Sequence, residues 1–542
     1  MIRSRFTAPN TLGLIAAAAV TGAATLAAPD ASALGDKIFA ADKAESVSRG
    51  FGFPGRSDVS ISSRYSRPRD SADPYNTFRD TPPFFPTRLD WVYDQGNKND
   101  IIDDASDLGW KFGTSLNSFL SDEIGKSVRV LGRDADFNGN PTVNGNPGTD
   151  VRVGDIWAED YFQVCVDRLR IAVPAGADTI QVDDPGGSYR SAIKGNGGYG
   201  AASLAKMRQY LQTRATAAQL SSWGLPSTIP DNFNYASFVR GKGGEDKIAA
   251  GLKAFHEQML LDGLRRFYSR IRQEARALNG GTSLPVSCNN SSNLSWRADF
   301  NWADWGMAET VLSKTTAKNI RTWIRRGEDR GHAQVLLAPR FDADTPPAGY
   351  VDDVRRSIAT TYAMGGIMQV PWDVFQSGTK TRYFGEPKDF ADLYGFIRAI
   401  PGYFDGYEEV FTRGGGIPTS GFGFKDSPFW LSGNTSGVVA SLRARPGNTS
   451  RPLMLHVVDW DTPQSFKLIL DPNQLFNGGN FACHLFTPTA YNSGTHSTAL
   501  STGNLRPLRK VQFLSRKRRS DGRWEVTVPA VSPWGIIRIE KR

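Results

Sequence analysis

Cysteine is scarce in this chain. Only three of its 542 residues are cysteines, Cys165, Cys288 and Cys483, and they lie far apart in the sequence. This spacing excludes a dense disulfide scaffold and a Cys-x-x-Cys metal clip, and it allows one disulfide at most. We therefore expect three free, mostly buried thiols in a fold that is held together by ordinary hydrophobic cores.

Histidine is also scarce, with five residues scattered along the chain. His256-Glu257 lacks the second histidine of a zinc-binding helix, and no Gly-x-Ser-x-Gly elbow occurs. These absences disfavour hydrolysis by a zinc ion or by a serine triad. We interpret His256-Glu257 as an ordinary pair on the surface of a helix.

Two weaker patterns remain for a cofactor or a metal. The glycine-rich segment 195–200 follows no predicted strand, so it is not typical of a dinucleotide site. Asp136, Asn138 and Asn140 could ligate calcium, although side chains of this kind more often cap turns. We expect no cofactor and no metal.

Long apolar runs are missing as well. Arg3 and Arg5 precede a short apolar run over 12–19, and Ala31-Ser-Ala33 provides the small residues of a cleavage site. The run is too short to span a bilayer, and no later stretch approaches the roughly 20 apolar residues that a span needs. The sequence therefore predicts a signal peptide over 1–33, a secreted or periplasmic protein, and no stable membrane insertion.

The composition is that of a soluble protein with more than one core. The chain is 39% hydrophobic and 22% charged, and its net charge is +9. The densest basic run, 506–519, contains Val511 and Phe513 between its cations. It reads as a strand and hairpin edge whose cations discourage aggregation, with a polymer-binding patch as the alternative.

From about residue 86 the chain alternates between short apolar strands and helical segments. Residues 34–85 show little periodicity and read as an arm or linker. Eight strands followed by helices over 86–405 predict an α/β fold of the (β/α)₈ TIM-barrel type. The predicted strands are 88–93, 110–116, 128–131, 179–183, 284–288, 300–307, 333–338 and 366–370.

Two regions depart from this alternation. The segment 186–245 is long for a strand-to-helix connection and contains one convincing helix, 201–214, so we expect it to form a lid or subsites. Over 406–542 the apolar residues alternate with period two between turn residues, which predicts a C-terminal antiparallel β-sandwich.

Polar side chains follow most of the predicted barrel strands. In a barrel the carboxyl ends of the strands form one mouth, where catalytic residues gather. Carboxylates and amides bind vicinal hydroxyls, indoles stack on pyranose rings, and a pair of acids can cleave an acetal. A carbohydrate site is therefore predicted from Asp90, Asn117, Asp134, Asp183, Asp184, Asn289, Asp304, Glu309, Arg340, Trp372 and Asp373.

Two motifs carry a resemblance to a known group. The first is Gln181-Val-Asp-Asp-Pro185 on the fourth predicted strand, and the second is Asp304-Trp-Gly-Met-Ala-Glu309 on the sixth. Through these motifs the chain resembles (β/α)₈ glycoside hydrolases with a C-terminal β-sandwich, particularly the α-galactosidase and dextranase-like groups. The resemblance implies that Asp183 is the nucleophile and Glu309 the acid/base. It implies sugar binding or pKa tuning for Asp184. Each role has a second claimant, because Asp184 adjoins Asp183 and Asp304 precedes Glu309.

We also expect Trp302, Trp305 and Met307 to surround Glu309 and raise its pKa, with packing of both indoles as the alternative. The predicted function is a retaining glycoside hydrolase whose partner is a carbohydrate and not a nucleic acid. Two alternatives remain: a non-catalytic carbohydrate-binding protein, and a polysaccharide lyase that would use Arg340 or Tyr93 against a uronic acid.

Overall fold

The computed structural model describes most of the chain after its first 51 residues. The described residues are 52–62, 85–92, 98–117, 119–120, 134–142, 152–183, 197–290, 298–339, 347–371, 387–421, 427–445, 451–476 and 478–542. The predicted signal peptide and the predicted strand 128–131 lie outside them. No helix in these ranges is long and apolar enough to cross a membrane. All three cysteines are free and buried, as predicted.

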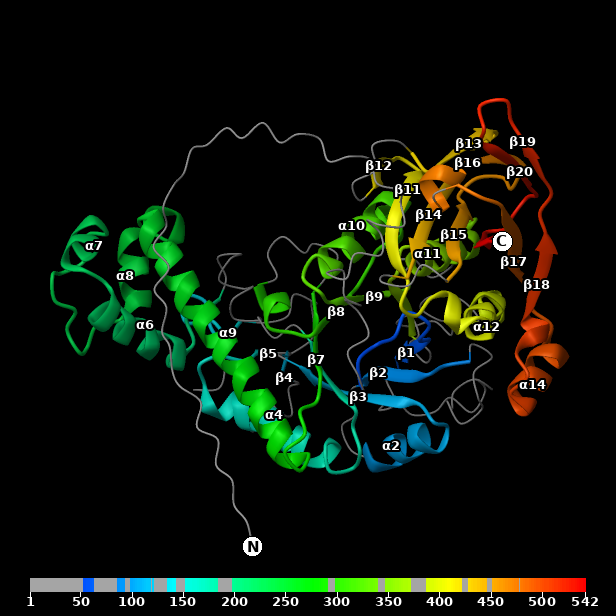
Figure 1. Ribbon diagram of the computed structural model, residues 1–542. Helices are drawn as coiled ribbons and strands as arrows, with labels where there is room; N and C mark the ends of the chain where they lie inside the picture. Colours follow the sequence, from blue (N-terminus) through cyan, green and yellow to red (C-terminus); the bar gives the residue numbers. More distant parts are fainter. Residues whose placement is uncertain are drawn as a thin grey trace, which may run out of the picture.

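Eight parallel strands close into a barrel, which confirms the predicted fold class (Figure 1). Around the barrel the order is β1, β10, β9, β8, β7, β6, β3, β2. Each strand of three to seven residues is buried where its side chains are described, because helices cover the outside. The strands are β1 (Ser60–Ser62), β2 (Arg88–Val92), β3 (Lys111–Asn117), β6 (Thr179–Asp183), β7 (Val286–Asn289), β8 (Trp305–Ala308), β9 (Ala333–Leu337) and β10 (Ile367–Pro371).

The first barrel strand differs from the sequence prediction. β1 lies inside the segment 34–85 that we expected to be an arm or linker, and it pairs in parallel with both β2 and β10. Three residues, Ser-Ile-Ser, are too few to show a period. The closed barrel takes β1 as its first strand, and the predicted strand 128–131 lies outside the described residues. In the order of the chain β6 is the fourth barrel strand and β8 the sixth, so Asp183 still ends the fourth strand and Glu309 still follows the sixth.

Amphipathic helices cover the barrel. The longest, α9, buries Leu252, Met259, Leu264, Phe267 and Ile271 along one stripe, as the spacing of these residues predicts. The barrel helices are α2 (Lys98–Asp107), α4 (Glu159–Ala172), α9 (Ala250–Leu278), α10 (Ala317–Glu328), α11 (Tyr350–Ala363) and α12 (Ala391–Ala399). Short 3₁₀ turns occur at Glu245–Lys247, Ala298–Asn301, Leu312–Lys314, Pro387–Asp389, Pro401–Tyr403 and Arg506–Leu508.

The insertion after β6 holds three helices instead of the one predicted. α6 (Ala201–Arg214) has the predicted bounds, and α7 (Ala217–Ser222) and α8 (Tyr235–Lys242) follow it. The last two are six and eight residues long, too short to show a convincing stripe, and side-chain caps from Thr216 and Asn234 fix their first turns. These helices lie at the end of the molecule remote from the sandwich (Figure 1). A small two-stranded sheet, β4 (Phe119–Leu120) with β5 (Arg152–Val153), lies outside the barrel.

The C-terminal region is the predicted antiparallel β-sandwich. One sheet has the order β12, β11, β14, β15, β21, β17, β18, and the other β13, β16, β20, β19. The first comprises β11 (Glu408–Gly414), β12 (Ile417–Gly421), β14 (Val438–Ala444), β15 (Leu453–Asp459), β17 (Phe481–Pro488), β18 (Arg509–Phe513) and β21 (Trp534–Lys541). The second comprises β13 (Phe429–Gly433), β16 (Phe466–Leu470), β19 (Arg516–Arg518) and β20 (Trp524–Val528), and two helices, α13 (Pro472–Phe476) and α14 (Ser493–Thr502), join the strands.

The centre of the seven-stranded sheet is buried on both faces. Along β15, Leu453, Leu455 and Val457 belong to the core between the two sheets, whereas Met454 and Val458 belong to the core shared with the barrel. Two-sided burial explains why five of the seven residues of this strand are apolar instead of alternating with polar residues. The sandwich is therefore fixed to the barrel by a hydrophobic interface rather than by a flexible linker alone.

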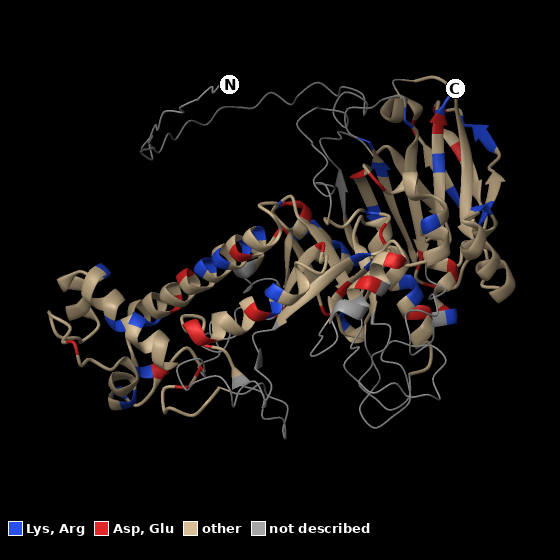
Figure 2. Ribbon diagram, turned by 90° about the horizontal axis from the view of Figure 1, so that it is seen from below, with Lys and Arg blue, Asp and Glu red and all other residues tan. Residues whose placement is uncertain are grey.

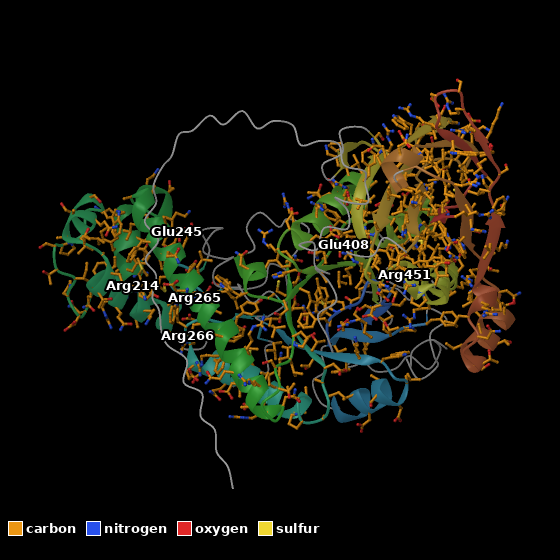
Figure 3. The ribbon with its side chains drawn as sticks, in the orientation of Figure 1. Arg214, Glu245, Arg265, Arg266, Glu408 and Arg451 are labelled. Carbon is orange, nitrogen blue, oxygen red and sulfur yellow. The ribbon has the colours of Figure 1, made fainter. Side chains whose placement is uncertain are left out.

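A buried cluster of charges also joins the two domains. Arg56, just before β1, donates to Glu328 at the end of α10 (3.1 Å) and to Glu408 at the start of β11 (2.7 Å), the residue labelled where barrel and sandwich meet in Figure 3. Burial and the neighbouring Arg56 lower the pKa of Arg443 to about 10. Both guanidinium groups lie against Gly365, whose positive φ and missing Cβ leave room for them.

Removal of one member of this cluster should destabilise the whole protein. We expect Arg56→Met to lower the free energy of unfolding by about 3–5 kcal/mol, because Glu408 and Glu328 would each lose a cationic neighbour while their charges stay buried. Urea unfolding measures the change. Arg170→Met, which breaks an exposed pair with Asp167, is the matched control and should change stability by less than about 1 kcal/mol. Equal effects of the two substitutions would contradict the prediction.

Candidate active site

A carboxylate and an amide meet at the ends of two neighbouring barrel strands. β6 ends at Asp183 and β7 ends at Asn289, and Asn289 Nδ2 donates a hydrogen bond of 2.8 Å to Asp183 Oδ1. Both residues are buried, with 6% and 3% of their surfaces exposed. Asn117 ends β3 and pairs in register with Asp183. Three adjacent strands therefore end in polar residues at one level, as the sequence predicts.

Glu309 follows the sixth strand at the same end of the barrel. In register, Asn289 on β7 pairs with Met307 on β8, and Glu309 comes two residues after Met307. Because the strands are parallel, Glu309 lies beyond the same ends as Asp183. Glu309 is exposed. The barrel thus places a buried carboxylate and an exposed one at a single mouth.

Asp304 lies at the opposite end of the barrel from Asp183, which corrects its predicted position. β8 begins at Trp305, so Asp304 precedes the strand. Its Oδ2 accepts hydrogen bonds of 2.7 Å from the backbone N–H of Val286, at the start of β7, and from Arg272 of α9. The predicted strand 300–307 began too early, because the residues before Trp305 form a 3₁₀ turn. Asp304 attaches α9 to the bottom of the barrel.

The two tryptophans expected around Glu309 are also far from it. Trp305 is fully buried at the start of β8, with the Arg88 guanidinium 5.3 Å from the centre of its ring. Four residues of strand separate Trp305 from Glu309, a rise of about 13 Å. The carbonyl of Trp302, earlier still, accepts from Arg272. Both indoles pack at the bottom of the barrel, which was the alternative interpretation.

Asp90 lies inside the barrel but is already paired. Its Oδ2 accepts from Arg88 Nε at 2.6 Å and from Ser60 Oγ at 3.0 Å, and both charged side chains are fully buried. Arg88 also bonds Asp58 and the carbonyl of Gly52. An aspartate neutralised in this way holds β1 against β2. The structure therefore gives Asp90 a place within the barrel wall rather than at its mouth.

Asp134 lies under the insertion and not at the end of a barrel strand. Its carboxylate accepts hydrogen bonds from the backbone N–H groups of Gly198 (3.0 Å) and Gly200 (3.3 Å), directly before α6. The glycine-rich segment thus forms an anion-binding nest that the chain fills with its own carboxylate. Asp155 binds Ser203 in the first turn of the same helix. Two buried aspartates therefore fix the start of the insertion.

His256 is part of this attachment, which corrects its interpretation as a surface residue. It is buried, and its Nε2 lies 2.9 Å from the carbonyl oxygen of Gly198. Burial lowers the pKa of His256 to about 4. The sequence signal was present, because His256 is four residues after Leu252 and therefore on the apolar stripe of α9. The aromatic rings of Tyr199 and Tyr235 pack against it.

Four predicted site residues and one further candidate lie outside the described residues, whereas the residues of the calcium alternative are described. Asp136 Oδ1 accepts from the backbone N–H groups of Asn138 (2.8 Å) and Asn140 (2.9 Å), which is the turn-capping arrangement. The described residues contain no group of three or more His, Cys, Asp or Glu side chains that could hold a metal ion. The residues outside the description are Asp184, Arg340, Trp372 and Asp373, together with Tyr93.

Comparisons with known proteins give similarities of structure only. No family model and no curated protein sequence matches the chain. A noncanonic maltogenic alpha-amylase from Thermotoga neapolitana is similar over 90% of this chain and 99% of its own, with 10% identity and a TM-score of 0.47. The alpha-L-fucosidase isoenzyme 2 from Paenibacillus thiaminolyticus is similar over 89% and 99%, with 9% identity and a TM-score of 0.41.

A third solved structure is similar over a shorter part of the chain. The beta-galactosidase from the psychrophilic Marinomonas ef1 covers 64% of this chain and 60% of its own, with 10% identity and a TM-score of 0.46. An assignment of activity to this chain therefore depends on the residues at the mouth of its own barrel.

The attachment of the insertion should depend on pH. Burial, followed by the nearby Asp155, raises the pKa of Asp134 to about 7 from 3.8. The folded state then holds a proton that the unfolded state has released, so the contribution of Asp134 to stability falls by roughly 2–3 kcal/mol as pH rises from 5 to 8. The lowered pKa of His256 acts in the opposite direction below about pH 6.5, so urea unfolding at the two pH values compares each variant with the wild type. Relative to the wild type, Asp134→Asn should lose this contribution to the pH dependence, and Asp136→Asn, in the same loop, should keep it. An unchanged slope in Asp134→Asn would contradict the assignment.

Proposed function

We propose that this protein is a glycoside hydrolase that acts on a polysaccharide or an oligosaccharide. One observation carries the proposal: Asp183, oriented by Asn289, ends the fourth barrel strand, and Glu309 follows the sixth at the same mouth. Two carboxyl groups at one mouth are the minimum that acetal cleavage needs. We further propose that the other residues predicted from the sequence bind the sugar. These are Asn117, Asp184, Arg340, Trp372 and Asp373.

In this proposal the two acids have different tasks. The Asp183 carboxylate attacks the anomeric carbon as the bond from that carbon to the leaving oxygen breaks, and Glu309 donates a proton to that oxygen. A glycosyl ester of Asp183 results. Glu309 then takes a proton from water, and the water oxygen displaces Asp183 from the anomeric carbon. Two inversions at one carbon give net retention of configuration.

Asn289 supports the nucleophile by position. Its amide donates to Asp183 Oδ1, so it holds the attacking carboxylate in a fixed orientation. The exposure of Glu309 suits a group that must meet the leaving oxygen and then water. The proposal includes export: the first 33 residues would be removed, and the enzyme would meet its substrate outside the cytoplasm.

Loss of the nucleophile should abolish turnover without abolishing binding. We expect Asp183→Ala to lower kcat by at least about 10³-fold while the Kd for substrate stays within a few-fold, because the loss falls on the transition state. Substrates come from a polysaccharide panel scored by new reducing ends. Asp304→Ala is the matched control, since Asp304 lies at the other end of the barrel, and it should keep kcat within about tenfold. A fully active Asp183→Ala enzyme would refute the role.

Loss of the acid should depend on the leaving group. Glu309→Ala is expected to lower kcat/KM for an alkyl glycoside by about 10²-fold or more, and kcat/KM for a 2,4-dinitrophenyl glycoside much less, because dinitrophenolate leaves without protonation. Turnover of the activated substrate should still slow, because the second step loses its base. Sodium azide should restore turnover of the activated substrate and yield a glycosyl azide. Equal losses on the two substrates would remove Glu309 from the role of acid.

The stereochemistry separates this mechanism from its rivals. Proton NMR of the first-formed product should show the anomeric configuration of the substrate. Inversion would recast Asp183 as a base that acts through water. An unsaturated product that absorbs ultraviolet light would identify a lyase, and binding without any product would identify a carbohydrate-binding protein.

A further inference from the structure

Nearly all of the net charge of this chain lies in its last 37 residues. Residues 506–542 contain eleven Lys or Arg residues and three Asp or Glu residues, which gives +8 of a total of +9. The other 505 residues are therefore almost neutral as a set. A charge this concentrated produces a strong local field on one part of the molecule.

The fold places five of these cations on the two edge strands of the sandwich, β18 and β19. β18 is the edge strand of the seven-stranded sheet, and β19 is the edge strand of the four-stranded sheet. Only Leu514 and Ser515 connect them, and Leu514 is buried in the core between the sheets. Both free edges therefore belong to one continuous wall. Figure 2 shows β19, which consists only of Arg and Lys, as a blue arrow at the outer edge of the sandwich near the C-terminus.

Several cations of this wall are free to bind an external anion. Lys510, Lys517 and Arg518 are exposed, and none of them forms an ion pair or a side-chain hydrogen bond with another residue in the described part of the chain. Arg519 and Arg523, by contrast, pair with Asp521 and contribute less to the field. The five residues of β18 alone extend the wall over about 17 Å.

The same wall exposes apolar surface. Among the described residues three large apolar side chains are strongly exposed, and two of them, Val511 (53%) and Phe513 (54%), lie on β18, on the opposite face of this edge strand from the exposed Lys510. Prevention of edge-to-edge aggregation explains one or two charges on such a strand. It does not explain five cations on the two edge strands together with an exposed aromatic ring. Charge and apolar surface together are the properties of a binding surface.

We infer that this wall, formed by β18 and β19, binds an acidic polysaccharide. Carboxylate or sulfate groups along a sugar chain would pair with Lys510, Lys517 and Arg518, and the apolar face of a sugar ring would pack on Phe513. Single-stranded nucleic acid calls for several aromatic platforms, and Phe513 is the one strongly exposed aromatic ring among the described residues. The wall is on the sandwich, so this inference does not depend on hydrolysis at the barrel mouth.

The test measures binding of the full-length protein to dextran sulfate, polygalacturonate and neutral dextran by affinity electrophoresis. We expect both acidic polymers to retard the protein and neutral dextran not to. The combined variant Lys510→Glu, Lys517→Glu and Arg518→Glu should bind the acidic polymers at least about tenfold more weakly. Phe513→Ala should weaken binding about three- to tenfold through lost apolar contact.

Two matched controls separate this surface from net charge and from general exposure. The first control is a combined variant that changes the total charge equally at exposed positions beside and on α10: Lys314→Glu, Lys318→Glu and Arg326→Glu. It should keep the affinity for the acidic polymers within about twofold. Ile171→Ala removes the third exposed apolar side chain and should also leave binding unchanged. Thermal unfolding checks that every variant is folded.

Three results would overturn the inference. Equal loss of binding in both triple variants would reduce it to net charge. Equal retardation by neutral dextran would remove the role of the anionic groups. Tighter binding to phosphatidylserine vesicles than to either acidic polymer would assign the wall to a lipid surface. None of these measurements requires turnover, so a failure here is distinguishable from a failure of the proposed hydrolysis.

Discussion

The barrel closes through a strand of only three residues, and ion pairs made by the residues just before that strand hold it in place. Arg56 precedes β1 and reaches Glu328 and Glu408, while Asp58 accepts from Arg88 on the neighbouring strand and from Thr87 just before it. Ser60 bonds Asp90 from within β1. Without β1 the sheet would have two open edges, at β10 and β2. The closed mouth that brings β6, β7 and β8 together depends on these contacts.

The same contacts explain why barrel and sandwich form one body. Arg56 belongs to the barrel and Glu408 to the sandwich, so the charge cluster that secures β1 also secures β11. The hydrophobic interface around Met454, Val458 and Trp534 surrounds it and keeps water away. Burial strengthens such interactions once every partner is present and makes the loss of any one of them costly. Integrity of the mouth and docking of the sandwich are therefore linked.

The insertion shows how the chain uses acidic residues for attachment as well as for chemistry. Asp134 and Asp304 were predicted to bind sugar, and Asp155 holds the same helix as Asp134, yet each of the three accepts backbone N–H groups and fixes a neighbouring segment of the fold. A carboxylate before a helix or a strand is equally suited to both tasks. What distinguishes Asp183 is that it ends its strand and meets a side-chain amide from the next one.

The sequence by itself determined the elements whose pattern is long enough to repeat. The bounds of α6, the stripe of α9, the antiparallel strands of the sandwich and the polar ends of β6 and β7 all follow from local spacing. The tertiary structure alone decided which short segment closes the barrel, which end of β8 carries Asp304, and how the cations of β18 and β19 form one wall. These depend on partners far away in sequence, and neither a three-residue strand nor a single aspartate carries a period that could reveal its partner.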